Sequence, residues 1–271
     1  MATGANVKDK SELRWAVGIT TVPVRRDNLF PQTLASIRAA GFPDPWLFVD
    51  GSNDGWHKGQ GFSVAGITER WPAVRIAGNW VLALTELYYR FPSAERYAMF
   101  QDDLVCCRNL RRYLERVPYP DGVYSFMGSP GYLNLYTAPC NQQIVPTDQT
   151  VRHEPIHGWY KGHQLGKGAV ALVFSQEAVV TLLSSRHLAD RPKDLDRGWR
   201  LIDGGISSSM TKAGWTEYVH HPSLVKHTGK VRSWHSHDGS PAGTNGLRPA
   251  EWIDYYDDTS FPGEDFDALC L

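Results

Sequence analysis

Short apolar runs alternate with amphipathic stretches along most of the chain. Runs with the length and residue types of buried strands cover residues 15–21, 46–49, 74–76, 97–101, 123–127 and 169–174. Apolar positions at helical spacing predict helices over residues 28–40, 79–90, 108–117 and 175–185. This alternation predicts an α/β fold with a mostly parallel central sheet flanked by helices. Such sheets bind ligands at the carboxyl ends of their strands.

Composition narrows the class of protein. The 28 Lys and Arg residues nearly balance the 29 Asp and Glu residues, so no global field favours nucleic acid or anionic membrane. No stretch approaches the ~20 apolar residues of a transmembrane helix, and the polar N-terminus lacks the apolar stretch of a secretory signal. The four cysteines show neither a C-x-x-C spacing nor a disulfide framework. We therefore expect a cytoplasmic protein with reduced cysteines.

Two adjacent carboxylates, Asp102 and Asp103, directly follow the apolar run at residues 97–101. Paired carboxylates at the end of a strand suit a hard divalent cation that bridges protein oxygens to substrate phosphates. Alternatively, they cap the helix predicted over residues 108–117, because Asp favours helix starts. These residues alone do not decide between a cation site and a cap.

Three segments together resemble the nucleotide-sugar-dependent glycosyltransferases of the GT-A fold. The segment F-V-D-G-S-N-D at residues 48–54 resembles the V-D-D-G-S-x-D loop of family 2 glycosyltransferases. The segment Q-D-D at residues 101–103 lies where such enzymes carry a D-x-D motif. The segment P-S-L-V-K-H-T-G at residues 222–229 resembles their P-S-L-V-Q-H-x-G segment. The resemblance covers about residues 15–229.

The resemblance assigns roles to the acidic residues of the first half. Asp50 would hydrogen-bond the nucleotide base, and Thr20 would lie beside the same base. Asp103 would bind Mn²⁺ or Mg²⁺, which holds the diphosphate, and Asp102 would contact the ribose or sugar or support the site from behind. Gln101 departs from the pattern because it replaces the first acidic residue of the motif.

In the second half, the resemblance makes His227 the second protein ligand of the metal, and imidazole suits Mn²⁺. Asp203 would be the base that takes the proton of an acceptor hydroxyl in an inverting transfer. It could instead be only the N-cap of a helix predicted to reach residue 213, and Asp194 and Asp196 are rival bases. Lys230 could hold phosphate oxygens or be an ordinary exposed lysine.

The expected organisation is a polar leader (1–12), one GT-A-like domain (13–232) and an irregular tail (233–271). Residues 13–127 would form the nucleotide-binding half, and residues 128–232 the acceptor and catalytic half. The stretch 128–168 has weak periodicity, which is typical of a functional or mobile segment, and we expect part of it to bind the acceptor.

The expected function is metal-dependent transfer of a sugar from a nucleotide-diphosphate donor, favoured as a UDP-sugar, to a hydroxyl acceptor. The acceptor stays open among a glycan, a protein side chain, a metabolite and a modified DNA base. A DNA acceptor would predict a basic face on the Arg-rich stretch 108–116, which is more simply a solvated helix surface.

Other classes of protein fit less well. A nucleotidyltransferase would carry a Gly-rich basic loop after the first strand, but residues 20–26 contain no glycine. A non-catalytic carbohydrate- or nucleic-acid-binding module would explain Gln101. The segment H-E-P-I-H at residues 153–157 matches the zinc motif H-E-x-x-H, but Pro155 argues against the continuous helix that this motif needs.

Overall fold

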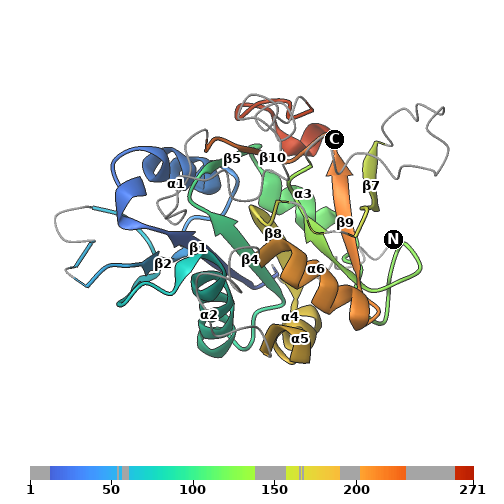
Figure 1. The fold of residues 1–271 in the computed structure, drawn as a ribbon. Coiled ribbons are helices and arrows are strands. Elements are labelled where there is room, and N and C mark those ends of the chain that lie inside the picture. The colour runs from blue at the N-terminus through green and yellow to red at the C-terminus, as the bar shows by residue number, and fades with distance from the viewer. Residues whose placement is uncertain are drawn as a thin grey trace, which may run out of the picture.

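The computed structural model describes residues 13–53, 55–56, 61–137, 157–164, 166, 168–189, 202–229 and 260–271. These residues build a central sheet between two layers of helices (Figure 1). The arrangement is a mixed α/β fold of the GT-A-like type, which confirms the predicted fold class. None of the helices in these ranges is long and apolar enough to cross a membrane.

Eight strands form the large sheet. They are β1 (Trp15–Thr21), β2 (Trp46–Asp50), β3 (Gly66–Arg70), β4 (Arg96–Gln101), β6 (Gly131–Asn134), β7 (Gly158–Lys161), β8 (Ala171–Ser175) and β9 (Thr216–His221). Their order in space is β3-β2-β1-β4-β8-β6-β9-β7. The first four strands of this order are parallel, as are β6 and β9, whereas β8 and β7 run antiparallel to their neighbours. A second, two-stranded sheet pairs β5 (Leu104–Cys106) with β10 (Val225–His227).

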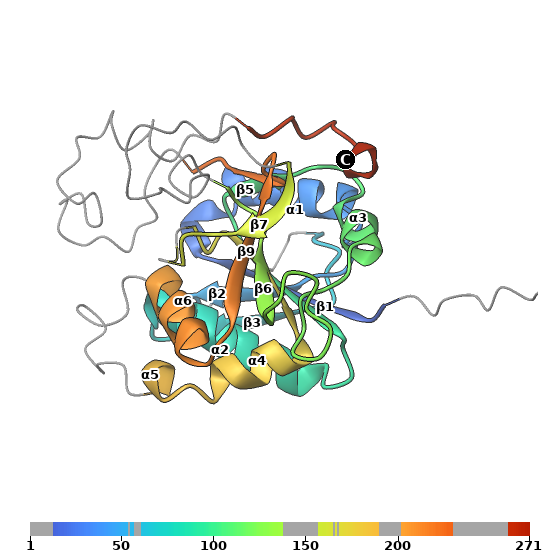
Figure 2. The same ribbon diagram turned by 90° about the vertical axis from the view of Figure 1, so that its right-hand side faces the viewer.

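Helices cover both faces of the large sheet (Figure 2). The helical elements are η1 (Pro23–Arg25), α1 (Leu29–Ala39), α2 (Arg75–Arg90), α3 (Leu110–Arg116), α4 (Gln176–Leu183), α5 (Arg186–Ala189), α6 (Ile202–Lys212) and η3 (Ala268–Cys270). Helices α1 and α3 pack on one face, and α2, α4, α5 and α6 pack on the other.

Successive residues of the central strands enter different cores. In β4, Ala98 and Phe100 join the core beneath α1 and α3, whereas Tyr97 and Met99 join the core beneath α2 and α4. All four side chains have no exposed surface. Burial on both faces explains why these strands read as continuous apolar runs in the sequence.

Several predicted elements are confirmed, and two predicted strands are wrong. The strand at residues 15–21 has the predicted bounds, and Asn28 caps α1 by accepting from the Leu29 amide at 2.5 Å. The strand predicted at residues 74–76 is wrong, because these residues form the start of α2. The third strand is β3 instead, which lies at the edge of the sheet and is only partly buried.

The strand predicted at residues 123–127 is also wrong. Its side chains find no core, and Val123 and Tyr124 are 73% and 78% exposed. The Asp121 carboxylate accepts from the amides of both residues, which holds the segment in a turn. The strand that follows is β6, which begins at Gly131.

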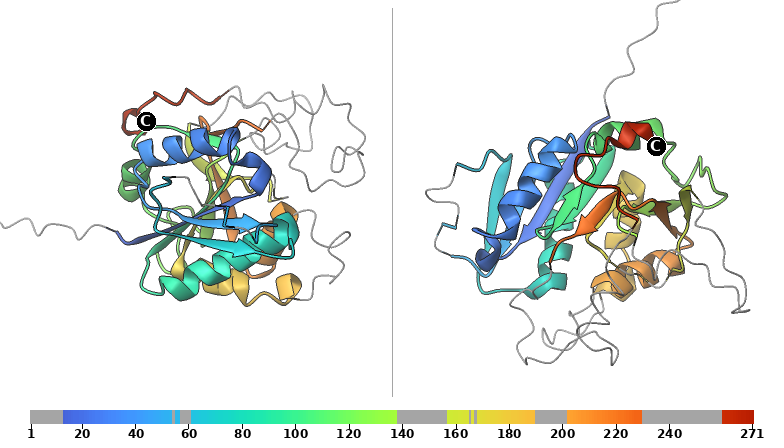
Figure 3. Two further views of the ribbon diagram at one scale, coloured as in Figure 1. Left: turned by 90° about the vertical axis from the view of Figure 1, so that its left-hand side faces the viewer. Right: turned by 90° about the horizontal axis from the view of Figure 1, so that it is seen from above.

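Part of the predicted irregular tail packs on the domain. Residues 260–271 cross over the top of the domain, and η3 at their end packs beside α3 (Figures 2 and 3). The Arg108 amide donates to Phe266 O at 3.0 Å, and Asn109 Nδ2 donates to Asp267 Oδ2 at 3.0 Å. The predicted leader and residues 233–259 of the tail lie outside the described ranges.

Close packing between β6 and β9 yields a stability prediction. A Cβ atom added at Gly131 would lie 2.4 Å from both Thr216 O and the Tyr218 ring, so Gly131→Ala should lower the free energy of unfolding by about 1–3 kcal/mol. At Gly204 in α6 an added Cβ meets nothing within 4 Å, so Gly204→Ala should be neutral or stabilising by up to about 1 kcal/mol. Urea unfolding of both variants measures the difference, and equal stabilities would contradict this packing.

Candidate functional site

The candidate site lies where β1, β2 and β4 end. A small pocket at this edge is lined by residues that include Thr20, Thr21, Asp50, Gln101, Asp102 and Asp103. The parallel register places Thr20 of β1 opposite Gln101 of β4, which brings the two strand ends together. The pocket therefore collects most of the predicted nucleotide-side residues.

Asp102 and Asp103 lie in a bend between β4 and β5, and their side chains have different partners. Asp102 Oδ2 accepts from Thr21 Oγ1 at 2.7 Å and from the Val22 amide at 3.3 Å. It therefore fixes the loop that follows β1. Thr33 Oγ1 of α1 donates to Asp102 O at 2.9 Å and holds the backbone between the two carboxylates.

Asp103 is the centre of a buried charge cluster. Its Oδ2 atom lies 3.1 Å from His227 Nε2 and 3.4 Å from Arg25 Nη2. Its Oδ1 atom is buried without a hydrogen-bond partner among the described residues. A Cβ atom added at Gly229 would lie 2.4 Å from Asp103 Oδ2, so only glycine fits beside the carboxylate in this arrangement. The structure thus brings together the two predicted metal ligands and adds Arg25, which was not predicted as a site residue.

Burial and neighbouring charges shift the pKa values of Asp103 and His227 in opposite directions. Burial raises the pKa of Asp103, but His227 and Arg25 together lower it below its usual value. Burial lowers the pKa of His227, but the Asp103 carboxylate raises it further than that, so the net shift is upward. The pKa of Asp102 is raised by burial and then by the charge of Asp103. Asp103 is therefore the carboxylate of the pair that stays ionised most readily.

Gln101 occupies its position for a structural reason. Its Nε2 atom donates to Ala169 O at 3.0 Å, and its backbone amide donates to Val170 O at 2.8 Å. Both bonds join the end of β4 to the segment that leads into β8. A carboxylate at this position could not donate the first bond. The departure from D-x-D is thus matched by a hydrogen bond that requires an amide.

Asp50 caps α2 from a neighbouring strand. Its Oδ1 atom accepts from the Val74 amide at 2.7 Å, and its Oδ2 atom accepts from the Arg75 amide at 2.9 Å. Arg75 has a positive φ of 70°, and these bonds hold its amide in place at the helix start. Both Asp50 and Thr20 line the pocket. Their contact with a nucleotide base stays a prediction.

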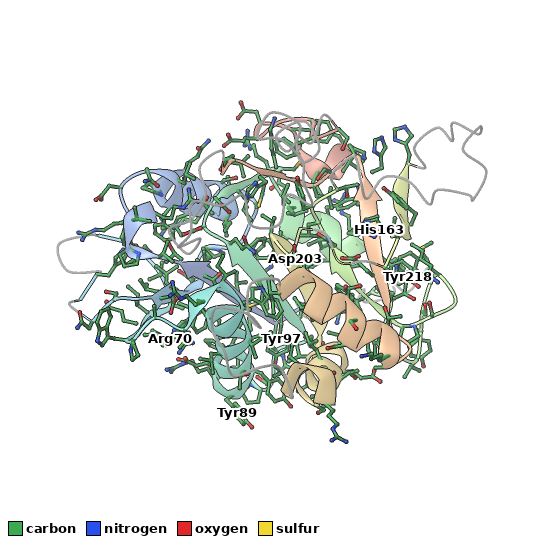
Figure 4. All side chains as sticks on the ribbon, viewed as in Figure 1. Arg70, Tyr89, Tyr97, His163, Asp203 and Tyr218 are labelled. Carbon is green, nitrogen blue, oxygen red and sulfur yellow. The ribbon has the colours of Figure 1, made fainter. Side chains whose placement is uncertain are left out.

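Asp203 lies in the first turn of α6 and is not its N-cap (Figure 4). Its Oδ2 atom accepts from the Gly168 amide at 2.9 Å, just before β8. Burial raises the pKa of Asp203, and hydrogen bonds from the amides of Ala169 and Gly168 offset part of that rise. Asp203 also interacts electrostatically with His227. The predicted base and the predicted metal ligands thus belong to one region.

A second buried carboxylate, Glu217, lies beside Asp203. Its Oε1 atom accepts from Asn134 Nδ2 at 3.0 Å, and its Oε2 atom has no partner among the described residues. Burial raises the pKa of Glu217 to about 7, and the charge of Asp203 adds to the rise. The sequence reasoning missed this residue, although a Glu inside the strand segment T-E-Y-V-H-H was a visible signal.

His220 has a structural role. Its Nε2 atom lies 2.6 Å from Tyr113 Oη, and its Nδ1 atom lies 2.7 Å from Pro222 O. Burial lowers its pKa to about 4, so the ring is neutral near pH 7.

Within the described ranges, no three His, Cys, Asp or Glu side chains are grouped to hold a metal. Lys230, Asp194, Asp196 and His153 of the sequence hypotheses lie outside those ranges.

These elements define a mixed α/β protein with a carboxylate-rich pocket at the carboxyl ends of its parallel strands. No family model matches the chain, and no curated protein matches it. Solved structures of similar fold include a protein named as a glucose-1-phosphate thymidylyltransferase from Bacillus anthracis. The identity is 11% and the TM-score 0.41, with 78% of this chain and 89% of the other covered.

Two further solved structures are similar at the same level. TarS from S. aureus is 10% identical with a TM-score of 0.43, and the match covers 77% of this chain but only 36% of TarS. A nucleoside-diphosphate-sugar pyrophosphorylase from Vibrio cholerae RC9 is 12% identical with a TM-score of 0.43, covering 79% and 95% of the two chains.

The buried Glu217 yields a pH prediction. Its folded pKa of about 7 lies above its ordinary value of 4.5, so its contribution to stability is complete below pH 4.5 and is lost as the pH rises through 7. Glu217→Gln removes this loss and keeps an oxygen that can accept from Asn134. The variant should therefore gain about 2 kcal/mol relative to wild type between pH 5.5 and 8.5.

Urea unfolding at both pH values measures this gain. The exposed Glu177 provides the matched control, because Glu177→Gln should follow the wild-type pH dependence. A constant difference between wild type and Glu217→Gln would show that Glu217 has no raised pKa.

Proposed function

We propose that this protein is a divalent-cation-dependent glycosyltransferase that moves a sugar from a nucleotide-diphosphate donor, favoured as a UDP-sugar, to a hydroxyl acceptor. One observation carries the proposal. Asp103 and His227 are 3.1 Å apart, and the buried base candidate Asp203 lies in the same region, although the three residues come from distant segments. That combination suits a reaction that needs both a cation and a base.

The residues around Asp103 fit a divalent cation. Asp103 Oδ1 is buried and has no hydrogen-bond partner among the described residues, so it would serve as an oxygen ligand, and the imidazole of His227 would be the nitrogen ligand beside it. Mg²⁺ and Mn²⁺ commonly use one or two protein ligands and complete their shell with water and substrate phosphates. When bound, such a cation neutralises the charge that develops on a departing diphosphate.

Asp203 would take the proton of the acceptor hydroxyl. Its raised pKa makes it a stronger base than an exposed Asp, and the amides of Gly168 and Ala169 hold its carboxylate in place. A base on the side away from the leaving group corresponds to inversion at the sugar carbon.

The donor would bind the pocket where β1, β2 and β4 end. Asp102 holds the loop after β1 in place through Thr21 and Val22, which positions the wall of the pocket before ligand arrives. Thr20 and Asp50 remain the proposed contacts of the base, favoured as uracil. Lys230 follows the described segment that ends at Gly229 and remains a proposed phosphate ligand.

Two isosteric variants separate binding from chemistry. Calorimetry with UDP and UDP-sugars, with and without Mn²⁺, should show Mn²⁺-strengthened binding to wild type, and Asp103→Asn should lose that strengthening. Asp203→Asn should bind the donor as wild type does, yet release UDP from a UDP-sugar about 10²–10⁴-fold more slowly. Asp27→Asn is the matched control, because the Asp27 side chain is 82% exposed.

The competing functions give different results in the same experiments. A nucleotidyltransferase would release pyrophosphate from a nucleoside triphosphate and a sugar phosphate. A non-catalytic binding module would bind a carbohydrate or nucleic acid without releasing UDP from any donor. Absence of nucleotide binding in the presence of Mn²⁺ would contradict the proposed glycosyltransferase.

A further inference from the structure

Arg25 is a buried cation placed directly beside the proposed metal site. It is the last residue of η1, the turn that follows β1, and its side chain is only 6% exposed. Its Nη2 atom lies 3.4 Å from Asp103 Oδ2. A buried guanidinium is costly unless it is paired with an anion. The Asp103 carboxylate provides such an anion at this position.

The backbone that carries Arg25 is anchored independently of that ion pair. The Arg25 amide donates to Val22 O at 3.0 Å, and the Val22 amide in turn donates to Asp102 Oδ2. The turn thus stays attached to the pocket wall even if the guanidinium leaves Asp103. Rotation of the side chain alone can then carry the guanidinium towards another anion in the pocket.

The Asp103 carboxylate cannot serve Arg25 and a divalent cation equally well. Asp103 Oδ2 already contacts two cationic or potentially cationic groups, Arg25 and His227. A divalent cation at this carboxylate would meet the guanidinium as a like charge. A diphosphate in the pocket offers the guanidinium another anion, and the planar fork of Arg matches phosphate oxygens well.

We infer that Arg25 couples metal binding to donor binding: it pairs with Asp103 in the free protein and moves to the donor's diphosphate when cation and donor bind. This inference rests on the proposed function. Arg25 then weakens the binding of the cation alone and strengthens the binding of the diphosphate. Because coupling between two ligands is reciprocal, cation and diphosphate each strengthen the binding of the other.

Calorimetry on the full chain tests the inference without any turnover assay. The titrants are Mn²⁺ alone, UDP alone, and UDP in saturating Mn²⁺. Relative to wild type, Arg25→Gln should bind Mn²⁺ alone about 10-fold more tightly and UDP with Mn²⁺ about 10-fold more weakly. Arg26→Gln is the matched control on the same turn and should behave as wild type. Arg25→Lys keeps the charge and should lie between wild type and Arg25→Gln.

A second variant addresses the ion pair from the other side. Asp103→Asn removes the charge of the Asp103–Arg25 ion pair, so UDP without metal should bind more tightly than it does to wild type. Adding Arg25→Gln to that variant should remove the gain. The comparison of Asp103→Asn with wild type remains valid if Arg25→Gln alone unfolds, because Asp103→Asn keeps the size of the side chain.

The outcomes separate the inference from the proposed function. If wild type binds UDP more tightly with Mn²⁺, but Arg25→Gln has wild-type affinity for Mn²⁺ alone, the inference is overturned and the proposed donor site stands. If wild type binds no nucleotide with Mn²⁺ present, both fall. Tighter Mn²⁺ binding together with weaker UDP binding in Arg25→Gln would support the inference.

Discussion

The pairing of β10 with β5 is the constraint on which the site depends. β5 begins directly after Asp103, and the register sets His227 opposite Leu104. The Thr228 amide also donates to Asp103 O at 2.7 Å. These backbone bonds hold the imidazole 3.1 Å from the carboxylate, although the two residues are far apart in the chain. A shift of this register would separate the two groups without changing either side chain.

The carboxylates at the two sides of the site have pKa values shifted in opposite directions, although all of them are buried. One side is formed around Asp103, and the other around Asp203 and Glu217. Asp103 lies among Arg25 and His227, which lower its pKa against the effect of burial. Asp203 and Glu217 lie near each other, and burial raises the pKa of both. Environments that drive the pKa values of carboxylates apart are typical of sites that divide binding and proton transfer between them. Under the proposed function, a carboxylate would thus bind a cation at one end of the site and take a proton at the other.

The sequence predicts elements well where burial is complete and poorly where it is partial. The strands at residues 15–21 and 97–101 are buried on both faces, so their apolar runs identify them. Residues 66–70 were missed because an edge strand needs fewer apolar residues. Four of the residues 123–127 are large hydrophobic residues that stay exposed, because the turn at Asp121 keeps the segment out of the sheet. Tertiary contacts decide which apolar segments become buried, and the local sequence pattern does not contain that information.

The sequence likewise predicts some residues of the candidate site and misses others. Asp103 and His227 were predicted from segments that resemble a known family, and the structure shows that they touch. Arg25 and Glu217 were not predicted as site residues, because a basic residue in a turn and an acidic residue in a strand acquire their roles only through burial beside a charge. Gln101 illustrates the same limit, since its value as a donor depends on a carbonyl contributed by a distant segment. Motifs thus identify residues that act through their own chemistry, whereas residues that tune a neighbour become visible only when the fold brings the two together.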